Sequence, residues 1–199
     1  MAKNSPSVVI LAGPNGAGKT TAAPLLLKGT LGVKEFVNAD LIAQGLSGFA
    51  PERAAMAAGR AMLARIRELA RQRASFAFET TLASRSFAAW IESLIDQRGY
   101  QFHLVFLWLP TADFAVARVC DRVRLGGHDV PEETIRRRYD RGLWNFFSLY
   151  QPLATTWRMY DNSRWLKPKL IVSGRNSISE IVYDRQLWRR VKRGIGYEG

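Results

Sequence analysis

Eight consecutive residues, Gly13-Pro14-Asn15-Gly16-Ala17-Gly18-Lys19-Thr20, match the pattern G-x-x-x-x-G-K-[ST] at every fixed position. Small residues in such a run allow successive backbone N–H groups to curl around an anion. A helix beginning near Gly18 would add the positive end of its dipole. The pattern predicts a loop that binds the phosphates of a nucleotide through Gly13, Asn15, Gly16, Ala17, Gly18, Lys19, Thr20 and Thr21.

The two polar side chains that end this run have separate roles in the predicted chemistry. Lys19 would reach the β- and γ-phosphates, and the hydroxyl of Thr20 would ligate Mg²⁺. We therefore expect ATP and Mg²⁺ to bind here. A chance glycine-rich turn is the alternative, but an apolar strand is expected before the run and a helix after it, as a phosphate loop requires. The pattern N-K-x-D, by which GTPases read guanine, does not occur in the sequence.

Acidic side chains follow two further predicted strands. Asp40 comes just after Phe36-Val37-Asn38, and a kinase needs a carboxylate to orient the attacking hydroxyl. Asp40 could equally cap a helix that begins at Leu41. The strand Phe76-Ala77-Phe78 ends in Glu79, Thr80 and Thr81, which could hold an acceptor or a metal-bound water. The alternative is a solvated Glu79 beside a threonine that caps a turn.

Seven arginines lie between residues 118 and 141, on either side of Gly126-Gly127, and an arginine clamp can stabilise the charge that spreads over a transferred phosphoryl group. A helical lid with a glycine hinge is one way to deliver such a clamp, and we place the lid at roughly 118–140. A solvated basic surface is the alternative. We expect at least two of the seven to be functional and favour Arg118 and Arg122, four residues apart on one helix face; the others are Arg124, Arg136, Arg137, Arg138 and Arg141. His128 is expected to be a loop residue.

Aromatic residues follow the arginines, at Trp144, Phe146, Phe147 and Tyr150. Interleaved arginines and aromatics can bind RNA, but their helical spacing favours a place in the core. The segment Tyr160-Asp161-Asn162-Ser163 either ends a strand near the nucleotide base or forms a turn.

Strand and helix patterns alternate along the chain. Five strands are expected, near 7–12, 36–38, 76–79, 102–109 and 170–172, and helices are expected near 18–27, 40–46, 51–73, 87–97, 111–125, 131–160 and 178–191. This alternation predicts an α/β protein of three layers, with a parallel sheet between helices, as in P-loop NTPases. In such sheets ligands bind beyond the carboxyl ends of the strands, where the residues discussed above are expected to lie.

The composition limits the class of protein without choosing a substrate. The 199 residues carry a formal net charge of +12, with a basic C-terminal helix expected at roughly 176–194. Such charge attracts nucleotides, sugar nucleotides, RNA or acidic lipid. One cysteine, Cys120, excludes an internal disulfide and fits a reducing cytoplasm. No apolar run approaches a membrane span, and we expect a single kinase domain over 1–199.

The ordered set of motifs resembles the zeta-toxin family of P-loop kinases. The motifs are G-P-N-G-A-G-K-T at 13–20, F-V-N-A-D at 36–40, F-E-T-T-L at 78–82, R-x-x-x-R-x-R-x-G-G-H-x-V-P at 118–131 and Y-D-N-S at 160–163. The resemblance implies an adenylate-kinase-like core, Asp40 as the residue that activates the acceptor hydroxyl, and Glu79, Thr80 and Thr81 as substrate contacts. Toxic members of the family phosphorylate UDP-N-acetylglucosamine and are restrained by a small antitoxin. The extra substrate-contacting structure of the larger toxins has no counterpart that we can locate in this sequence.

The sequence thus predicts an ATP-dependent kinase that acts on a hydroxyl of a small molecule, with Lys19, Asp40, Arg118 and Arg122 as catalytic residues. A sugar nucleotide is the acceptor that the resemblance implies. A polynucleotide 5′-kinase and a nucleotide-gated RNA-binding protein are the alternative functions, and the basic surface would serve either of them.

Overall fold

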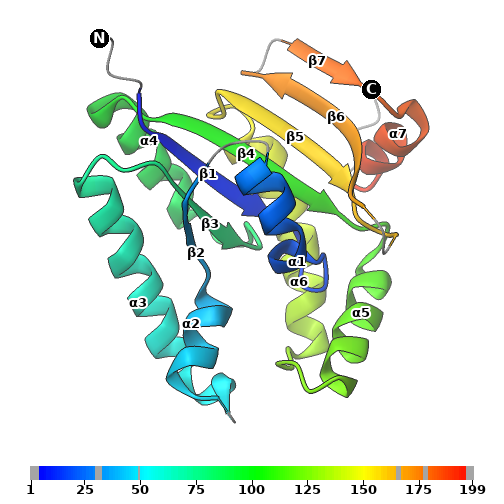
Figure 1. Cartoon of the computed structure of the whole chain (residues 1–199). Helices are drawn as coiled ribbons and strands as arrows, with labels where there is room; N and C mark the ends of the chain where they lie inside the picture. The colour runs from blue at the N-terminus through cyan, green and yellow to red at the C-terminus, as the bar shows by residue number, and fades with distance from the viewer. Residues whose placement is uncertain (1–4, 30–32, 49, 165–166, 177–178, 196–199) are drawn as a thin grey trace.

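A seven-stranded sheet runs through the molecule, and its strands lie in the order β2-β3-β1-β4-β5-β6-β7 (Figure 1). The computed structural model describes residues 5–29, 33–48, 50–164, 167–176 and 179–195. The strands are β1 (Ser7–Ala12), β2 (Glu35–Val37), β3 (Phe76–Thr80), β4 (Gln101–Trp108), β5 (Thr156–Asp161), β6 (Lys169–Arg175) and β7 (Ser179–Val182). Strands β1 to β5 pair in parallel, whereas β6 and β7 pair antiparallel.

Helices cover both faces of the sheet, which gives the three layers that the sequence predicted (Figure 1). They are α1 (Lys19–Ala23), which continues into the π-helical segment η1 (Pro24–Gly29), α2 (Ala39–Leu46), α3 (Pro51–Arg71), α4 (Ser86–Arg98), α5 (Ala112–Arg124), α6 (Glu132–Asn145), the π-helical segment η2 (Phe146–Tyr150) and α7 (Arg185–Arg193). None of the described helices is long and apolar enough to cross a membrane.

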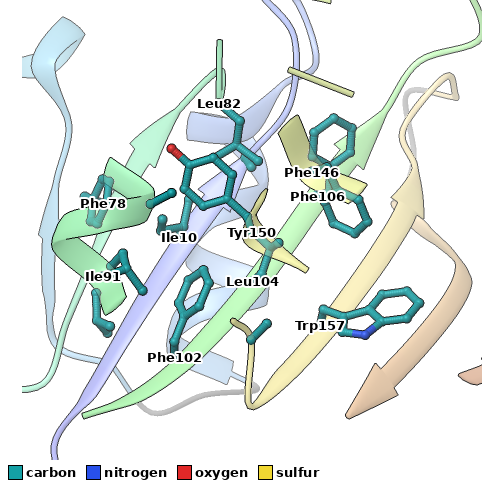
Figure 2. Packing of buried hydrophobic residues seen from close by; sticks show 14 of the residues in the cluster. Ile10, Phe78, Leu82, Ile91, Phe102, Leu104, Phe106, Phe146, Tyr150 and Trp157 are labelled. Carbon is teal, nitrogen blue, oxygen red and sulfur yellow. The ribbon is translucent and has the colours of Figure 1, made fainter. Parts of the chain in front are cut away.

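Strand β1 shows why the chain forms layers. Its residues alternate between the two faces of the sheet, and both faces are apolar because both are covered. Val8 and Ile10 join the cluster beneath α3, α4, α6 and α7, while Val9 and Leu11 join the cluster beneath α1 and α5. Figure 2 shows the first cluster, in which Ile10 lies near the rings of Phe78 and Tyr150.

The parallel register brings the ends of distant segments to one edge of the sheet. Leu11 pairs with Glu79, so β1 and β3 end side by side. Trp108 pairs with Asp161, so β4 and β5 also end together. The segments that follow β1, β2, β3 and β5 therefore all begin at the carboxyl edge, where ligands bind in sheets of this kind.

Two of the predicted elements differ from the structure. The helix expected over 131–160 ends at Tyr150, and Thr156–Asp161 forms the fifth parallel strand β5. Pro152 lies two residues after Tyr150 and does not favour continuation of a helix. Residues within the helix expected over 178–191 instead form β7, and α7 begins only after Asp184, whose carboxylate accepts hydrogen bonds from the backbone N–H groups of Gln186 and Leu187. The sheet thus has two strands more than predicted, and the predicted strand near 170–172 is antiparallel.

The aromatic residues after the arginines divide between core and surface. Phe146 and Tyr150 are completely buried, and Phe147 packs against them, as predicted from their spacing. Trp144 is 56% exposed, so its predicted place in the core is wrong. The 3.6-residue period of α6 turns this position away from the sheet.

Candidate active site

The phosphate loop connects β1 to α1 and lies against α5. Gly16 and Gly18 adopt φ angles of 76° and 73°, in the left-handed region that favours glycine. A Cβ on Gly16 would lie 2.8 Å from the backbone oxygen of Ala115 in α5. The loop therefore needs glycine both for its own conformation and for its close approach to α5.

Lys19 is held inside the loop. Its ammonium group donates hydrogen bonds of 3.0 Å to the backbone oxygens of Gly13 and Pro14, and it lies 3.7 Å from a carboxylate oxygen of Glu79. Burial lowers the pKa of Lys19 below its ordinary value of 10.5, and the carboxylates of Glu79 and Asp40 oppose that shift. A γ-phosphate would supply further negative charge to this buried cation.

Glu79, Asn38 and Thr20 form one hydrogen-bonded network at the ends of β3, β2 and the loop. The Asn38 amide donates to Glu79 Oε2 at 2.6 Å and to Thr20 Oγ1 at 3.2 Å, and Thr20 Oγ1 donates to Glu79 Oε2 at 2.9 Å. The side chain of Glu79 is only 11% exposed, so the interpretation of Glu79 as a solvated residue is wrong. Its partners hold the carboxylate beside Lys19 and Thr20.

The capping alternative for Asp40 is also wrong, because Asn38 caps α2. The side-chain oxygen of Asn38 accepts hydrogen bonds from the backbone N–H groups of Asp40 and Leu41, at 2.7 and 3.2 Å. Asp40 is the second residue of the helix, and its exposed carboxylate lines the cleft that also contains Lys19 and Thr20. The cap thus fixes the backbone of Asp40 while its carboxylate stays available.

A cleft of about 370 Å³ lies between the phosphate loop, α2 and α5. Arg118 and Arg122 both line it. Arg118 donates to the backbone oxygen of Ser163 at 2.8 Å, and Arg122 donates to that of His128 at 2.6 Å. His128 lies in the loop after α5, as predicted.

Arg122 has a spare donor of the kind that an anion would use. Its buried Nε has no hydrogen-bond partner among the described residues. Buried donors in proteins are nearly always paired, so an orphaned one calls for an explanation. A phosphate oxygen in the cleft would satisfy it, which fits the binding of a nucleotide here.

Arg138 of α6 is a cleft residue that sequence analysis did not single out. Its Nη1 lies 3.5 Å from the side-chain oxygen of Asn15, and it lines a small cavity of about 110 Å³ together with Asp40, Glu79, Thr80 and Thr81. Nothing in the spacing distinguishes Arg138 from the neighbouring arginines. The close packing of α5 and α6 decides which arginine faces the loop.

The other four arginines lie away from the cleft. Arg124 pairs with Asp121, and Arg136 pairs with Asp113 and Glu132. Arg137 is exposed, and Arg141 lines a different hollow. The alternative interpretation, a solvated basic surface, thus describes part of the segment.

Most of the predicted nucleotide-binding residues meet at the main cleft, which is lined by Asn15, Gly16, Gly18, Lys19, Thr20 and Thr21. Gly13 and Ala17 do not line the cleft. The backbone oxygen of Gly13 accepts a hydrogen bond from the Lys19 ammonium group, and that of the buried Ala17 accepts one from the Asn162 amide at 2.7 Å. Thr80 Oγ1 also accepts a hydrogen bond from the backbone N–H of Leu82, at 3.2 Å, so a threonine does stabilise the turn after β3.

The segment after β5 extends the site on the other side of the loop. Asp161 ends β5, and Asn162 reaches across to Ala17. A second cleft of about 160 Å³ opens there between Thr21, Leu25, Arg118, Asn162 and Arg164. It adjoins the phosphate cleft through Gly18, Thr21 and Arg118, so a nucleotide could have its phosphates in one cleft and its nucleoside in the other.

Thr20 and Glu79 provide oxygen ligands of the kind that Mg²⁺ prefers. The described residues contain no group of three or more histidine, cysteine, aspartate or glutamate side chains that could hold a metal ion by themselves. Mg²⁺ is commonly bound by one or two protein oxygens together with substrate phosphates and water. The pair beside Lys19 fits that form of binding.

A larger hollow of about 890 Å³ lies beside the segment that follows Thr81. It is lined by Ala83, Ser84, Arg85, Ser86, Arg141, Trp144, Asn145, Ser148 and Leu149. Arg141 lies one helical turn after Arg138, so α6 borders both the small cavity and this hollow. Sequence analysis gave no sign of it, because its walls come from two segments about sixty residues apart.

The family model of an AAA domain, AAA_33, matches residues 8–141, about two thirds of the chain. The chain belongs to the AAA_33 family. The match spans the phosphate loop, Asp40, Glu79 and the arginines from Arg118 to Arg141. A relative from Haemophilus influenzae described as an uncharacterized protein is 26% identical over 131 residues, which cover 66% of this chain and 91% of the relative.

Two of the solved structures that this fold resembles are complexes of two proteins. The AvrRxo1-ORF1:-ORF2 complex with ATP has a TM-score of 0.70 at 17% identity, and the match covers 94% of this chain and 63% of that one. The PezAT chromosomal toxin–antitoxin system of Streptococcus pneumoniae has a TM-score of 0.67 at 15% identity, covering 100% and 82%. This AAA_33 chain thus spans less than two thirds of the AvrRxo1 chain, and at these identities the likeness establishes a P-loop kinase-type fold.

Proposed function

We propose that this AAA_33 protein is a kinase that transfers the γ-phosphate of ATP to a hydroxyl group of a small molecule. The observation that carries the proposal is the position of the Asp40 carboxylate, which lines the same cleft as Lys19, Thr20 and two lid arginines. A phosphate loop alone is compatible with many functions. A free carboxylate facing it supplies the group that a kinase needs to orient an acceptor hydroxyl.

The residues divide the transfer among themselves. The acceptor oxygen attacks the γ-phosphorus, the bond from that phosphorus to the ADP oxygen breaks, and the hydroxyl proton passes to Asp40. Lys19, Arg118, Arg122 and Arg138 neutralise the charge on the phosphate oxygens as it redistributes. Thr20 and Glu79 would hold Mg²⁺, which when bound neutralises further charge on the β- and γ-phosphates.

The acceptor that we favour is a sugar nucleotide. The small cavity at Asp40 has room for a hydroxyl group. The larger hollow, whose lining begins just after Thr81 in sequence, is lined by the exposed side chains of Trp144, Arg85 and Arg141. An aromatic face and two guanidinium groups suit a flat ring and an anionic linker. UDP-N-acetylglucosamine, the acceptor implied by the zeta-toxin resemblance, has both.

A small protein partner is part of the same proposal. PezAT is named as a toxin–antitoxin system, and the AvrRxo1 structure is a complex of the products of two open reading frames. We propose that an antitoxin-like protein binds this chain as well. Co-purification with the product of a neighbouring short gene, together with loss of transfer in the complex, would support this; activity unchanged by that product would refute it.

The first test is transfer of labelled γ-phosphate into a panel of acceptors. Asp40→Asn should lower transfer by roughly 10²- to 10⁴-fold, the range expected for a general base, while ATP binding is retained. Asp113→Asn is the matched control, because Asp113 is exposed and pairs with Arg136 outside the cleft. Lys19→Ala serves as the blank. Near-normal turnover by the Asp40 variant would refute the assigned role.

The panel contains UDP-N-acetylglucosamine, other sugar nucleotides, NAD and 5′-hydroxyl RNA. Label on UDP-N-acetylglucosamine would support the full proposal. Label on another small molecule would keep the mechanism and replace the acceptor. Label on RNA alone would favour the polynucleotide 5′-kinase, and Lys19-independent label would contradict the kinase assignment.

A further inference from the structure

Helix α7 at the end of the described chain presents an unusual concentration of positive charge. Five of its nine residues are cationic and none is acidic. Trp188 and Val191 are buried against the sheet, and Arg190 lies over the ring of Trp108 at 5.9 Å. The remaining cations are exposed: Arg185, Arg189, Lys192 and Arg193. Of these, Lys192 Nζ lies 5.8 Å from the centroid of the Trp188 ring. We call these four residues the α7 basic face.

The α7 basic face has no internal counter-charge. Some exposed arginines elsewhere do pair with carboxylates, as Arg65 does with Glu35 and Arg136 does with Glu132. No ion pair joins the α7 basic face to any described residue of the chain. The nearest carboxylate in sequence, that of Asp184, already caps α7 and binds Lys169 at 2.7 Å. The charge of this face is therefore available to an external anion.

The spacing of the charges suits a chain of phosphates. Arg185, Arg189 and Arg193 lie four residues apart, on one row of the helix, so their Cα atoms rise by about 6 Å from one to the next. A row of guanidinium groups at that interval can contact successive phosphates of one nucleic acid strand, each by two hydrogen bonds. Lys192 adds a fourth charge beside the row.

The composition of the face distinguishes a nucleic acid from an acidic protein. Protein interfaces have an apolar or aromatic centre and are depleted of lysine there. Between the charges, the outer side of α7 offers only Gln186. Nucleic acid interfaces are polar and strongly basic. In addition, Tyr183, directly before α7, is 57% exposed and could stack on an unpaired base.

We propose that the α7 basic face, with Tyr183 beside it, is a docking site for single-stranded nucleic acid, contacted mainly through its phosphates. The site does not depend on the phosphotransfer proposed above, because none of its residues lines the nucleotide clefts. Lys19→Ala should therefore bind the strand as the unaltered protein does. Failure of one proposal leaves the other standing.

The test is the salt dependence of binding to a fluorescent 20-nucleotide RNA, measured by anisotropy with the whole chain. Each phosphate neutralised contributes about −0.7 to the slope of log K against log salt for a single strand. The triple variant Arg185→Gln/Arg189→Gln/Arg193→Gln should make the slope shallower by about 2 and weaken binding at least ~10-fold at moderate salt. Tyr183→Ala should weaken binding several-fold and leave the slope unchanged.

The matched control removes the same charge from another helix. Arg53, Arg60 and Arg67 of α3 are exposed and lie seven residues apart, and none lines a cleft. Arg53→Gln/Arg60→Gln/Arg67→Gln should retain affinity within about 2-fold, since its charges lie outside the proposed site. Equal losses in both triple variants, or displacement of RNA by polyglutamate at matched charge, would show general attraction to the +12 chain and overturn the proposal.

Two further results complete the test. Duplex RNA that binds more tightly than the single strand, or RNA binding that is absent at low salt, would also overturn the proposal. Circular dichroism checks that each triple variant is folded. Should the α7 triple variant fail to fold, Arg185→Gln, Arg189→Gln and Arg193→Gln taken singly should each reduce the slope by about 0.7.

Discussion

At the scale of single residues, Asn38 has the most connections in the candidate site. Its amide donates to Thr20 and Glu79, and its side-chain oxygen accepts from the backbone of Asp40 and Leu41. All four hydrogen bonds that an asparagine side chain readily makes are therefore used. One buried residue links Thr20 and Glu79, the proposed metal ligands, to the helix that carries the predicted base.

The hydrogen bonds that the Asn38 side chain donates and those that it accepts can be tested separately. Asn38→Ser keeps an oxygen that caps α2 but loses the amide donors, whereas Asn38→Ala loses both. We expect both variants to lower phosphoryl transfer by roughly 10-fold, an effect that a positioning residue can have. Only the alanine variant should also lose the cap, so it should unfold more easily than the serine variant by about 0.5–2 kcal/mol. Denaturant unfolding and the transfer assay measure the two effects, and full turnover by Asn38→Ser would show that the network is dispensable.

At the scale of elements, α6 and η2 fix the loop that follows β3. Asn145 donates to the backbone oxygen of Leu82 at 2.7 Å, and Tyr150 donates to that of Ser84 at 2.7 Å. Leu82 itself has a φ of 58°, so its left-handed backbone depends on such support. The aromatic and polar residues after the arginine segment thus hold the loop that follows Thr81 in place, which their sequence pattern did not reveal.

Gly142 allows α6 to approach that loop closely, and two glycine variants should separate this effect from helix propensity. A Cβ on Gly142 would collide with the backbone oxygen of Thr81, whereas one on Gly59 in α3 would meet nothing within 4 Å. Gly142→Ala should therefore destabilise the fold by about 1–3 kcal/mol. Gly59→Ala should stabilise it by about 0.5–1 kcal/mol through helix propensity. Thermal or urea unfolding measures both, and stabilisation by both substitutions would contradict the close packing of α6 on the loop.

At the scale of the whole molecule, the parallel strands of the sheet bring all parts of the site together. We expect the stability of the folded protein in weak acid to depend on one histidine in this sheet. His103 in β4 lies 2.8 Å from Thr156 Oγ1 in β5, at a partly buried position. Burial, together with the nearby positive charge of Arg158, lowers the pKa of His103 below its ordinary value of 6.5. The folded chain therefore binds fewer protons here than the unfolded chain between the two pKa values.

The consequence is a loss of stability in weak acid. As pH falls below about 6.5, the unfolded state takes up a proton that the folded state resists, and the free energy of unfolding decreases until the pH is below the folded pKa. His103→Gln keeps a hydrogen-bonding side chain without this titration. Its unfolding free energy should decline less steeply than that of the unaltered protein between pH 7 and 5. Parallel pH profiles would argue against a shifted His103.

The sequence by itself determined the features that are local in the chain. The phosphate loop is a contiguous motif whose glycines set their own backbone angles, and the first four strands and most helices follow from apolar periodicity. It also fixed the three-layer α/β class. The end of strand β5 was predicted only as one of two alternatives for Tyr160–Ser163, and β7 was missed, because short runs beside helical patterns carry too little periodicity to be told apart.

Only the tertiary structure decided which side chains meet. The hydrogen bonds that join Asn38, Glu79 and Thr20 span 18, 41 and 59 residues of sequence, so they depend on the parallel register that brings β1, β2 and β3 to one edge. The choice of Arg138 over its neighbours, and the exposure of Trp144, depend on how α6 is turned against the sheet. Residue type and spacing fix local backbone geometry, whereas the direction of each side chain is set by packing against elements that are far away in sequence.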